Sequence, residues 1–122
     1  MVQKYIVNDI VMYKNRIHTI IETLGLNNYE LSYVRHSVNQ AELSGVPLTH
    51  EILEKNEWKK TKVSDYDYYY YKDDLFLSYT LNGNTFCFCD FDYGCGLRVE
   101  IPYIHSLQHI LFGLGLNSEM EI

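Results

Sequence analysis

The order of apolar and polar positions predicts strands in the first third of the chain. β-Branched and aromatic residues are dense over residues 5–13 and again over 16–24, and the polar pair Lys14-Asn15 separates the two runs. A short polar break between two such runs is typical of a hairpin turn. Apolar and polar residues alternate again over 29–35. We therefore expect a small three-stranded, SH3-like antiparallel sheet within residues 1–36.

A short helix is predicted over residues 47–56. The Thr49 hydroxyl can accept a hydrogen bond from a free amide of the first turn, and the acidic Glu51 follows at the positive end of the helix dipole. Asn56 stands near the expected end of this helix.

The second half of the chain predicts an antiparallel meander over residues 66–101. Four consecutive tyrosines, 68–71, favour a strand, because tyrosine suits a pleated surface. Asn82-Gly83-Asn84 is the strongest hairpin signal of the sequence, and it joins two further apolar runs. A last half-buried strand is expected over 97–101.

A C-terminal helix is expected over residues 102–115, with Pro102 at its first position. Ile104, Leu107 and Leu111 repeat at helical spacing, and Gln108 or His105 beside them is expected to bond a backbone group of a neighbouring strand. Runs of strands with two helices indicate an α+β fold, with the meander packed against both helices. The 122 residues leave room for one domain, 1–122.

Charge and composition exclude several classes of protein. The 10 Lys and Arg residues are outnumbered by 16 Asp and Glu, for a net charge of -6, so bulk nucleic acid is not an expected partner. We expect no membrane association, because no apolar run is long enough for a spanning helix and the first residues lack the apolar core of a signal peptide. A cytoplasmic protein with reduced thiols at Cys87, Cys89 and Cys95 is therefore expected.

Three segments together carry a resemblance to a known group. Residues 9–20, 45–56 and 103–112 contain an N-terminal hairpin, the run V-P-L-T-H-E-I-L-E-K and the run Y-I-H-S-L-Q-H-I-L-F. In this order they resemble small uncharacterised bacteriophage and prophage proteins of gut bacteria that share I-P-L-T-x-E-x-L-x-K and Y-V-H-x-L-Q-N-L-Y-F motifs. His109 stands where that group has Asn. The resemblance implies a phage accessory protein in the cytoplasm of the infected host cell, directed at host physiology or defence.

The sequence contains no convincing metal or catalytic motif. His105 and His109 are four residues apart on the expected helix, but Ser106 stands where the zinc-protease pattern needs its Glu. The Cys87-x-Cys89 spacing is a poor match to a zinc knuckle, and residues 90–94 resemble a calcium loop whose twelfth position would be Ile101 rather than Glu. We expect no metal, no cofactor and no catalytic residue, and therefore a protein that is not an enzyme.

Two clusters of side chains are candidates for ligand binding. The 12 tyrosines concentrate in the block between Asp65 and Asp74, where Tyr68 and Tyr70 would face one way and Tyr69 and Tyr71 the other, so that one pair enters the core. Residues 35–40 offer a guanidinium, an imidazole, a hydroxyl and two amides. The candidate ligand-binding residues are Arg35, His36, Asn39, Gln40, Trp58, Tyr68, Tyr70 and Arg98.

These residues leave several interpretations open. The tyrosine block is equally an edge strand whose hydroxyls face solvent, and residues 35–40 are as easily a solvated loop. The favoured hypothesis is a counter-defence protein that binds and sequesters a small nucleotide-like immune signal of the host. The alternative is an acidic, tyrosine-rich module that inhibits a host protein. Either is compatible with a homo-oligomer.

Overall fold

The structure is a computed structural model that describes residues 4–25, 27–62, 67–73, 75–80, 85–89 and 98–122. The chain divides into two compact units. Unit 1 contains Met1–Pro47 and Tyr103–Met120, and unit 2 contains Leu48–Pro102 and Glu121–Ile122. The expectation of one domain over 1–122 stays a prediction.

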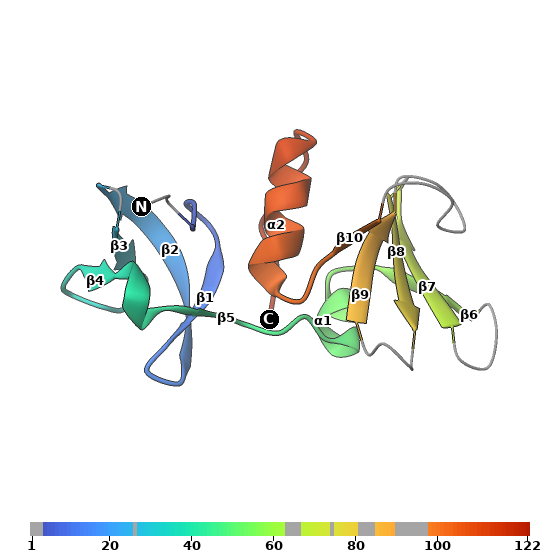
Figure 1. Ribbon diagram of the computed structural model, residues 1–122, viewed down its shortest axis with the longest axis horizontal. Coiled ribbons are helices and arrows are strands. Elements are labelled where there is room, and N and C mark those ends of the chain that lie inside the picture. The colour runs from blue at the N-terminus through green and yellow to red at the C-terminus, as the bar shows by residue number, and fades with distance from the viewer. Residues whose placement is uncertain (1–3, 26, 63–66, 74, 81–84, 90–97) are drawn as a thin grey trace. The chain divides into compact units, whose positions relative to one another are not determined.

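Unit 1 holds a five-stranded antiparallel sheet in the order β4-β3-β2-β1-β5. Its elements are β1 (Ile10–Tyr13), β2 (Arg16–Leu24), β3 (Asn28–Leu31), β4 (Val38–Asn39), the 3-10 turn η1 (Gln40–Glu42) and β5 (Ser44–Gly45). Strands β1 to β4 form a meander, and the fifth strand, β5, follows the 3-10 turn and returns to pair with β1. This is the SH3-like arrangement. Figure 1 shows β1 to β5 in blue and green. The predicted small SH3-like sheet is confirmed, with two strands more than the sequence indicated.

The first hairpin turns where the sequence predicts. Lys14 and Asn15 both have positive φ, 48° and 64°, as the two central residues of a type I′ turn require. Tyr13 pairs with Arg16 across the turn. The first strand is shorter than predicted, because the positive φ of Asn8, 79°, turns the chain before Ile10.

The C-terminal helix α2 (Ile104–Gly113) belongs to unit 1 and is anchored by hydrogen bonds. The Gln108 side chain is 1% exposed; its Oε1 accepts from Ile10 N–H at 2.8 Å, and its Nε2 donates to Asn8 O at 2.8 Å. One amide thus satisfies two backbone groups beside β1, and the prediction that Gln108 or His105 would bond a neighbouring strand is confirmed for Gln108. Tyr103 is the N-cap, so Pro102 precedes the helix rather than opening it.

Unit 2 holds a second five-stranded antiparallel sheet, in the order β10-β9-β8-β7-β6, and one short helix. The elements are α1 (His50–Lys55), β6 (Lys59–Lys62), β7 (Asp67–Lys72), β8 (Leu75–Thr80), β9 (Thr85–Cys89) and β10 (Arg98–Glu100). Thr49 caps α1 as predicted, since its Oγ1 accepts from Ile52 N–H at 3.3 Å. With two helices and two antiparallel sheets the α+β class is confirmed.

The sequence missed one strand of unit 2. Lys59–Lys62 has no apolar alternation, yet it pairs along its whole length with β7. The pairing partner, and not a local pattern, makes this segment extended. The predicted turn at 82–84 lies outside the described residues, although the strands on either side of it pair as a hairpin would.

The core of unit 2 lies on one face of its sheet. Tyr70 and Leu77 are 0% exposed and stand opposite each other on β7 and β8. Leu53 of α1 is also fully buried, and Trp58 is 4% exposed. Of the four tyrosines only Tyr70 is buried, whereas Tyr68, Tyr69 and Tyr71 are all half-buried, so one residue rather than the expected pair enters the core.

Candidate ligand-binding site

A pocket of about 670 Å³ lies in unit 2 where α1 ends and β6 begins. Its lining residues come from two short stretches of chain. One stretch contributes Glu57, Trp58 and Lys59, and the other contributes Tyr71, Lys72 and Asp73. The sheet register explains why they meet, because Lys59 stands directly opposite Tyr71. Glu57 and Asp73, with positive φ of 70° and 54°, turn the chain at the two margins.

The pocket combines aromatic surface with balanced charge. The Trp58 N–H donates to Leu53 O at 3.0 Å, and the residue is buried, so the indole forms part of the pocket wall and offers little free ring surface. Tyr71 is half-buried, and its ring centroid lies 6.4 Å from that of Phe76. Lys72 Nζ donates to Asn56 O at 3.0 Å. Two lysines and two carboxylates line the same space, so the pocket does not share the net charge of -6 of the whole chain.

Tyr70 has quite different surroundings from those of a surface ligand site. Its hydroxyl hydrogen-bonds His50 Nδ1, and the His50 ring packs against Tyr79 and Phe86 at centroid distances of 4.5 and 5.2 Å. Burial raises the pKa of Tyr70 to about 12 and lowers the pKa of His50, so both groups are neutral at pH 7. Tyr70 offers no exposed ring face, so a ligand could reach it only if the surrounding side chains moved. Its ligand-binding role stays a prediction.

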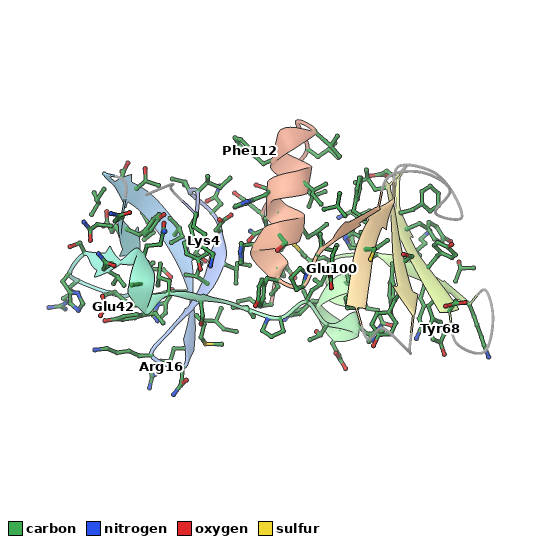
Figure 2. The ribbon with its side chains drawn as sticks, viewed as in Figure 1. Lys4, Arg16, Glu42, Tyr68, Glu100 and Phe112 are labelled. Atoms are coloured by element: carbon green, nitrogen blue, oxygen red, sulfur yellow. The ribbon has the colours of Figure 1, made fainter. Side chains whose placement is uncertain are left out.

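The remaining candidates of unit 2 are placed apart from one another. Tyr68 is half-buried at the β6 side of the sheet, where Figure 2 labels it, and the Lys60 ammonium lies 4.3 Å from its ring centroid. Arg98 begins β10, whose backbone pairs with β9, and its side chain lies outside the described residues. Of the predicted residues, Trp58 alone lines the pocket.

In unit 1, Asn39 and Gln40 are occupied by the fold. Asn39 caps η1, because its Oδ1 accepts from Ala41 N–H at 2.9 Å and its own N–H donates to Glu42. Gln40 Oε1 accepts from Tyr29 Oη at 2.6 Å and from Lys4 N–H at 2.9 Å. Both amides hold the chain between β4 and β5, and their ligand-binding roles stay predictions.

Arg35 and His36 are exposed, and His36 joins a cluster around Tyr13. The ring centroids of His36 and His18 lie 6.5 and 5.9 Å from that of Tyr13, and Lys14 Nζ lies 5.3 Å from it. His18 Nδ1 must carry its hydrogen, since it meets the carbonyl oxygen of Ser32 at 2.7 Å, and carbonyls only accept. No described contact joins Arg35 to this cluster.

The helical histidines do not form a metal centre with their neighbours. His109 Nε2 lies 2.6 Å from the Asp9 carboxylate, and His105 packs against Tyr5 and Tyr103. Among the described residues no group of three or more His, Cys, Asp or Glu side chains could hold a metal ion. Cys87 is not part of a disulfide, whereas the Cys89 side chain, Cys95 and residues 90–94 lie outside the described part of the chain.

Sequence reasoning missed most of the pocket. The sequence predicts Tyr71 only as the partner of Tyr69 on one strand face, and Lys59 and Lys72 are not among the candidate ligand-binding residues. The available signal was the position of Trp58 between a helix end and a lysine run. A large aromatic residue there must pack across the beginning of the next strand, which brings its neighbours to one place.

Comparison with protein-family models, curated proteins and solved structures finds no match to this chain. The resemblance to phage and prophage proteins therefore stays a prediction. Neither α1 nor α2, the helices of the described residues, is long and apolar enough to cross a membrane.

Proposed function

We propose that the protein is a non-enzymatic binding protein that sequesters a small anionic ligand with an aromatic ring, of the chemistry of a nucleotide. The single observation that carries this proposal is the pocket in which Trp58 and Tyr71 lie beside Lys59 and Lys72. The half-buried Tyr71 ring can stack on a nucleobase, and the ammonium groups attract phosphates. The counter-defence role of a phage accessory protein in the host cytoplasm, with a host immune signal as ligand, belongs to the same proposal.

The local charge supports an anionic ligand better than the whole-chain charge does. The chain carries -6 overall, but the pocket places two ammonium groups against two carboxylates. Glu57 and Asp73 are exposed, so solvent screens their repulsion of a phosphate.

A thermal-shift and calorimetry panel of cyclic dinucleotides and ADP-ribose derivatives tests the proposal. A true ligand at one hundred times its Kd stabilises the folded protein by about 2.7 kcal/mol. Lys59→Gln should weaken binding about threefold, and Glu57→Gln should strengthen it by a similar factor, because the two changes alter the pocket charge in opposite directions.

A matched aromatic pair separates stacking from charge. Tyr71→Phe keeps the ring and should leave the Kd nearly unchanged, whereas Tyr71→Ala should weaken binding about tenfold or more. The proposal is wrong if no nucleotide stabilises the protein, or if Lys59→Gln and Glu57→Gln shift the affinity in the same direction.

A further inference from the structure

The edge strand β6 differs from every other part of this acidic protein in its charge. All four of its residues are exposed, and three of them are lysines, Lys59, Lys60 and Lys62. Within the described residues β6 pairs with β7 alone, so its other edge has backbone N–H and C=O groups directed away from the sheet. Figure 1 shows β6 as the last strand of the second sheet.

The lysines occupy both faces of the strand. Lys60 and Lys62 share the face of Tyr70 and Tyr68, and Lys59 stands on the opposite face with Tyr71. An added strand has two faces, and ammonium groups stand on both sides of the sheet. Acidic side chains on either face of the added strand would therefore meet a lysine. Like charges directly opposite each other are destabilising, so a second copy of β6 is the wrong partner for this edge.

One lysine is already oriented on this surface. The Lys60 ammonium lies 4.3 Å from the ring centroid of Tyr68, which stands two residues along the neighbouring strand from its paired position. The contact turns the ammonium towards β7, so a carboxylate on an added strand would compete with this cation–π interaction, which is worth about 0.5–1 kcal/mol at an exposed site. A carboxylate opposite Lys60 on an added strand would lie at the short cross-strand distance that favours opposite charges.

We propose that β6 accepts an extended acidic segment of another protein as a sixth strand of this sheet. Backbone hydrogen bonds would supply the pairing, and glutamate or aspartate side chains opposite the lysines would supply the selectivity. Lys59 belongs to both this surface and the pocket of unit 2, whereas Lys60 does not line the pocket, so a change at Lys60 tests the strand edge apart from the small-molecule site.

Fluorescence anisotropy with a labelled peptide of alternating glutamate and threonine tests the proposal on the full chain. The peptide should bind, and a peptide of alternating lysine and threonine should not. Lys60→Glu should weaken binding of the glutamate peptide about tenfold and allow binding of the lysine peptide, because the cross-strand charge pair is reversed. Lys14→Glu, an equal change of charge on unit 1, should leave binding of the glutamate peptide nearly unchanged.

Backbone methylation of the peptide distinguishes strand pairing from charge attraction alone. Alternate N–H groups of an added strand face β6, so two glutamate peptides methylated at the odd or the even amides should differ in affinity by about tenfold or more. Equal affinities would overturn the proposal, as would a peptide that does not bind or that binds Lys60→Glu equally well. If the protein self-associates and Lys60→Glu abolishes this self-association, the proposal is wrong and the edge is a dimer interface.

The pocket variants keep the two sites distinguishable. Tyr71→Ala removes a pocket ring and should reduce nucleotide stabilisation by about half or more at the same ligand concentration, while Lys60→Glu should preserve it. If the peptide binds but no nucleotide does, the edge proposal stands and the pocket proposal fails. The converse result leaves the pocket proposal in place and rejects the edge.

Discussion

His105 and His109 stand one helical turn apart and meet opposite surroundings. His105 is 7% exposed, and its Nδ1 has no hydrogen-bond partner among the described residues. Burial lowers the pKa of His105 to about 4, against the opposing effect of the Asp9 charge and with smaller contributions from His109 and Lys4. His109 is partly exposed, and its hydrogen bond to Asp9 raises its pKa.

The buried imidazole of His105 predicts a loss of stability in acid. The unfolded chain binds a proton at His105 below the ordinary pKa of 6.5, whereas the folded chain does not until about 4. Acidification from about pH 7 to about pH 5, within this window, should therefore lower the free energy of unfolding by about 2 kcal/mol at this site. Urea unfolding of His105→Leu between about pH 7 and about pH 5 should show a smaller loss than the wild type. Equal losses would contradict the assignment.

The His109–Asp9 pair predicts the reverse dependence. Because the pKa of His109 is raised, its stabilising contribution is complete below the ordinary pKa and is lost as the pH rises through the folded value. An NMR titration should place the pKa of His109 above that of a histidine in a peptide, and Asp9→Asn should bring it down. An unchanged His109 titration in Asp9→Asn would show that another group raises the pKa.

At the scale of elements, helix α2 depends on one amide side chain. Gln108→Leu keeps the volume nearly constant but leaves Ile10 N–H and Asn8 O without their partner. A buried backbone group left unpaired costs about 1–3 kcal/mol, and Ile10 is buried whereas Asn8 is exposed to water, so we expect a loss of about 1–3 kcal/mol by urea unfolding. Phe112→Ala, on the same helix but 64% exposed, is the control and should cost about 0.5 kcal/mol or less.

The contact between β5 and the start of α2 predicts a second effect. A Cβ added at Gly45 would lie 2.5 Å from the Tyr103 ring and 2.9 Å from that of His105. Gly45→Ala should therefore destabilise the protein by about 1–3 kcal/mol in thermal or urea unfolding, because a ring and a strand must separate. Adding Tyr103→Ala should restore part of this loss. Additive losses would place the strain elsewhere.

The elements found from sequence are those whose signal is local. The Lys14-Asn15 turn and the Thr49 cap each depend on a few neighbouring residues, and Gln108 on one helical face. Strand β6 and the pocket depend on pairing, since Lys59 comes to Tyr71 only through the sheet register. The tyrosine block shows the same limit of prediction from sequence. A strand places successive tyrosines on opposite faces, but packing decides which tyrosine enters the core.

At the scale of the molecule, unit 2 is inserted between the two segments of unit 1. Its entry and exit meet, since Leu48 N–H donates to Pro102 O at 3.1 Å, and in unit 1 Pro47 forms a β-bridge with Tyr103. We expect residues 49–101 to be replaceable by a short Gly-Ser linker with unit 1 still folded. Circular dichroism and cooperative urea unfolding of that variant check the prediction; a chain with no cooperative transition would show that unit 1 depends on the insertion.

The paired entry and exit also set an order of events during synthesis. The ribosome makes the strands of unit 1 first, then all of residues 48–102, and only afterwards the helix whose Gln108 holds Ile10. At about 5–20 residues per second, the first sheet therefore waits seconds for its last element. A purified fragment of residues 1–102, which lacks that helix, should keep unit 2 resistant to protease and leave the N-terminal segment sensitive.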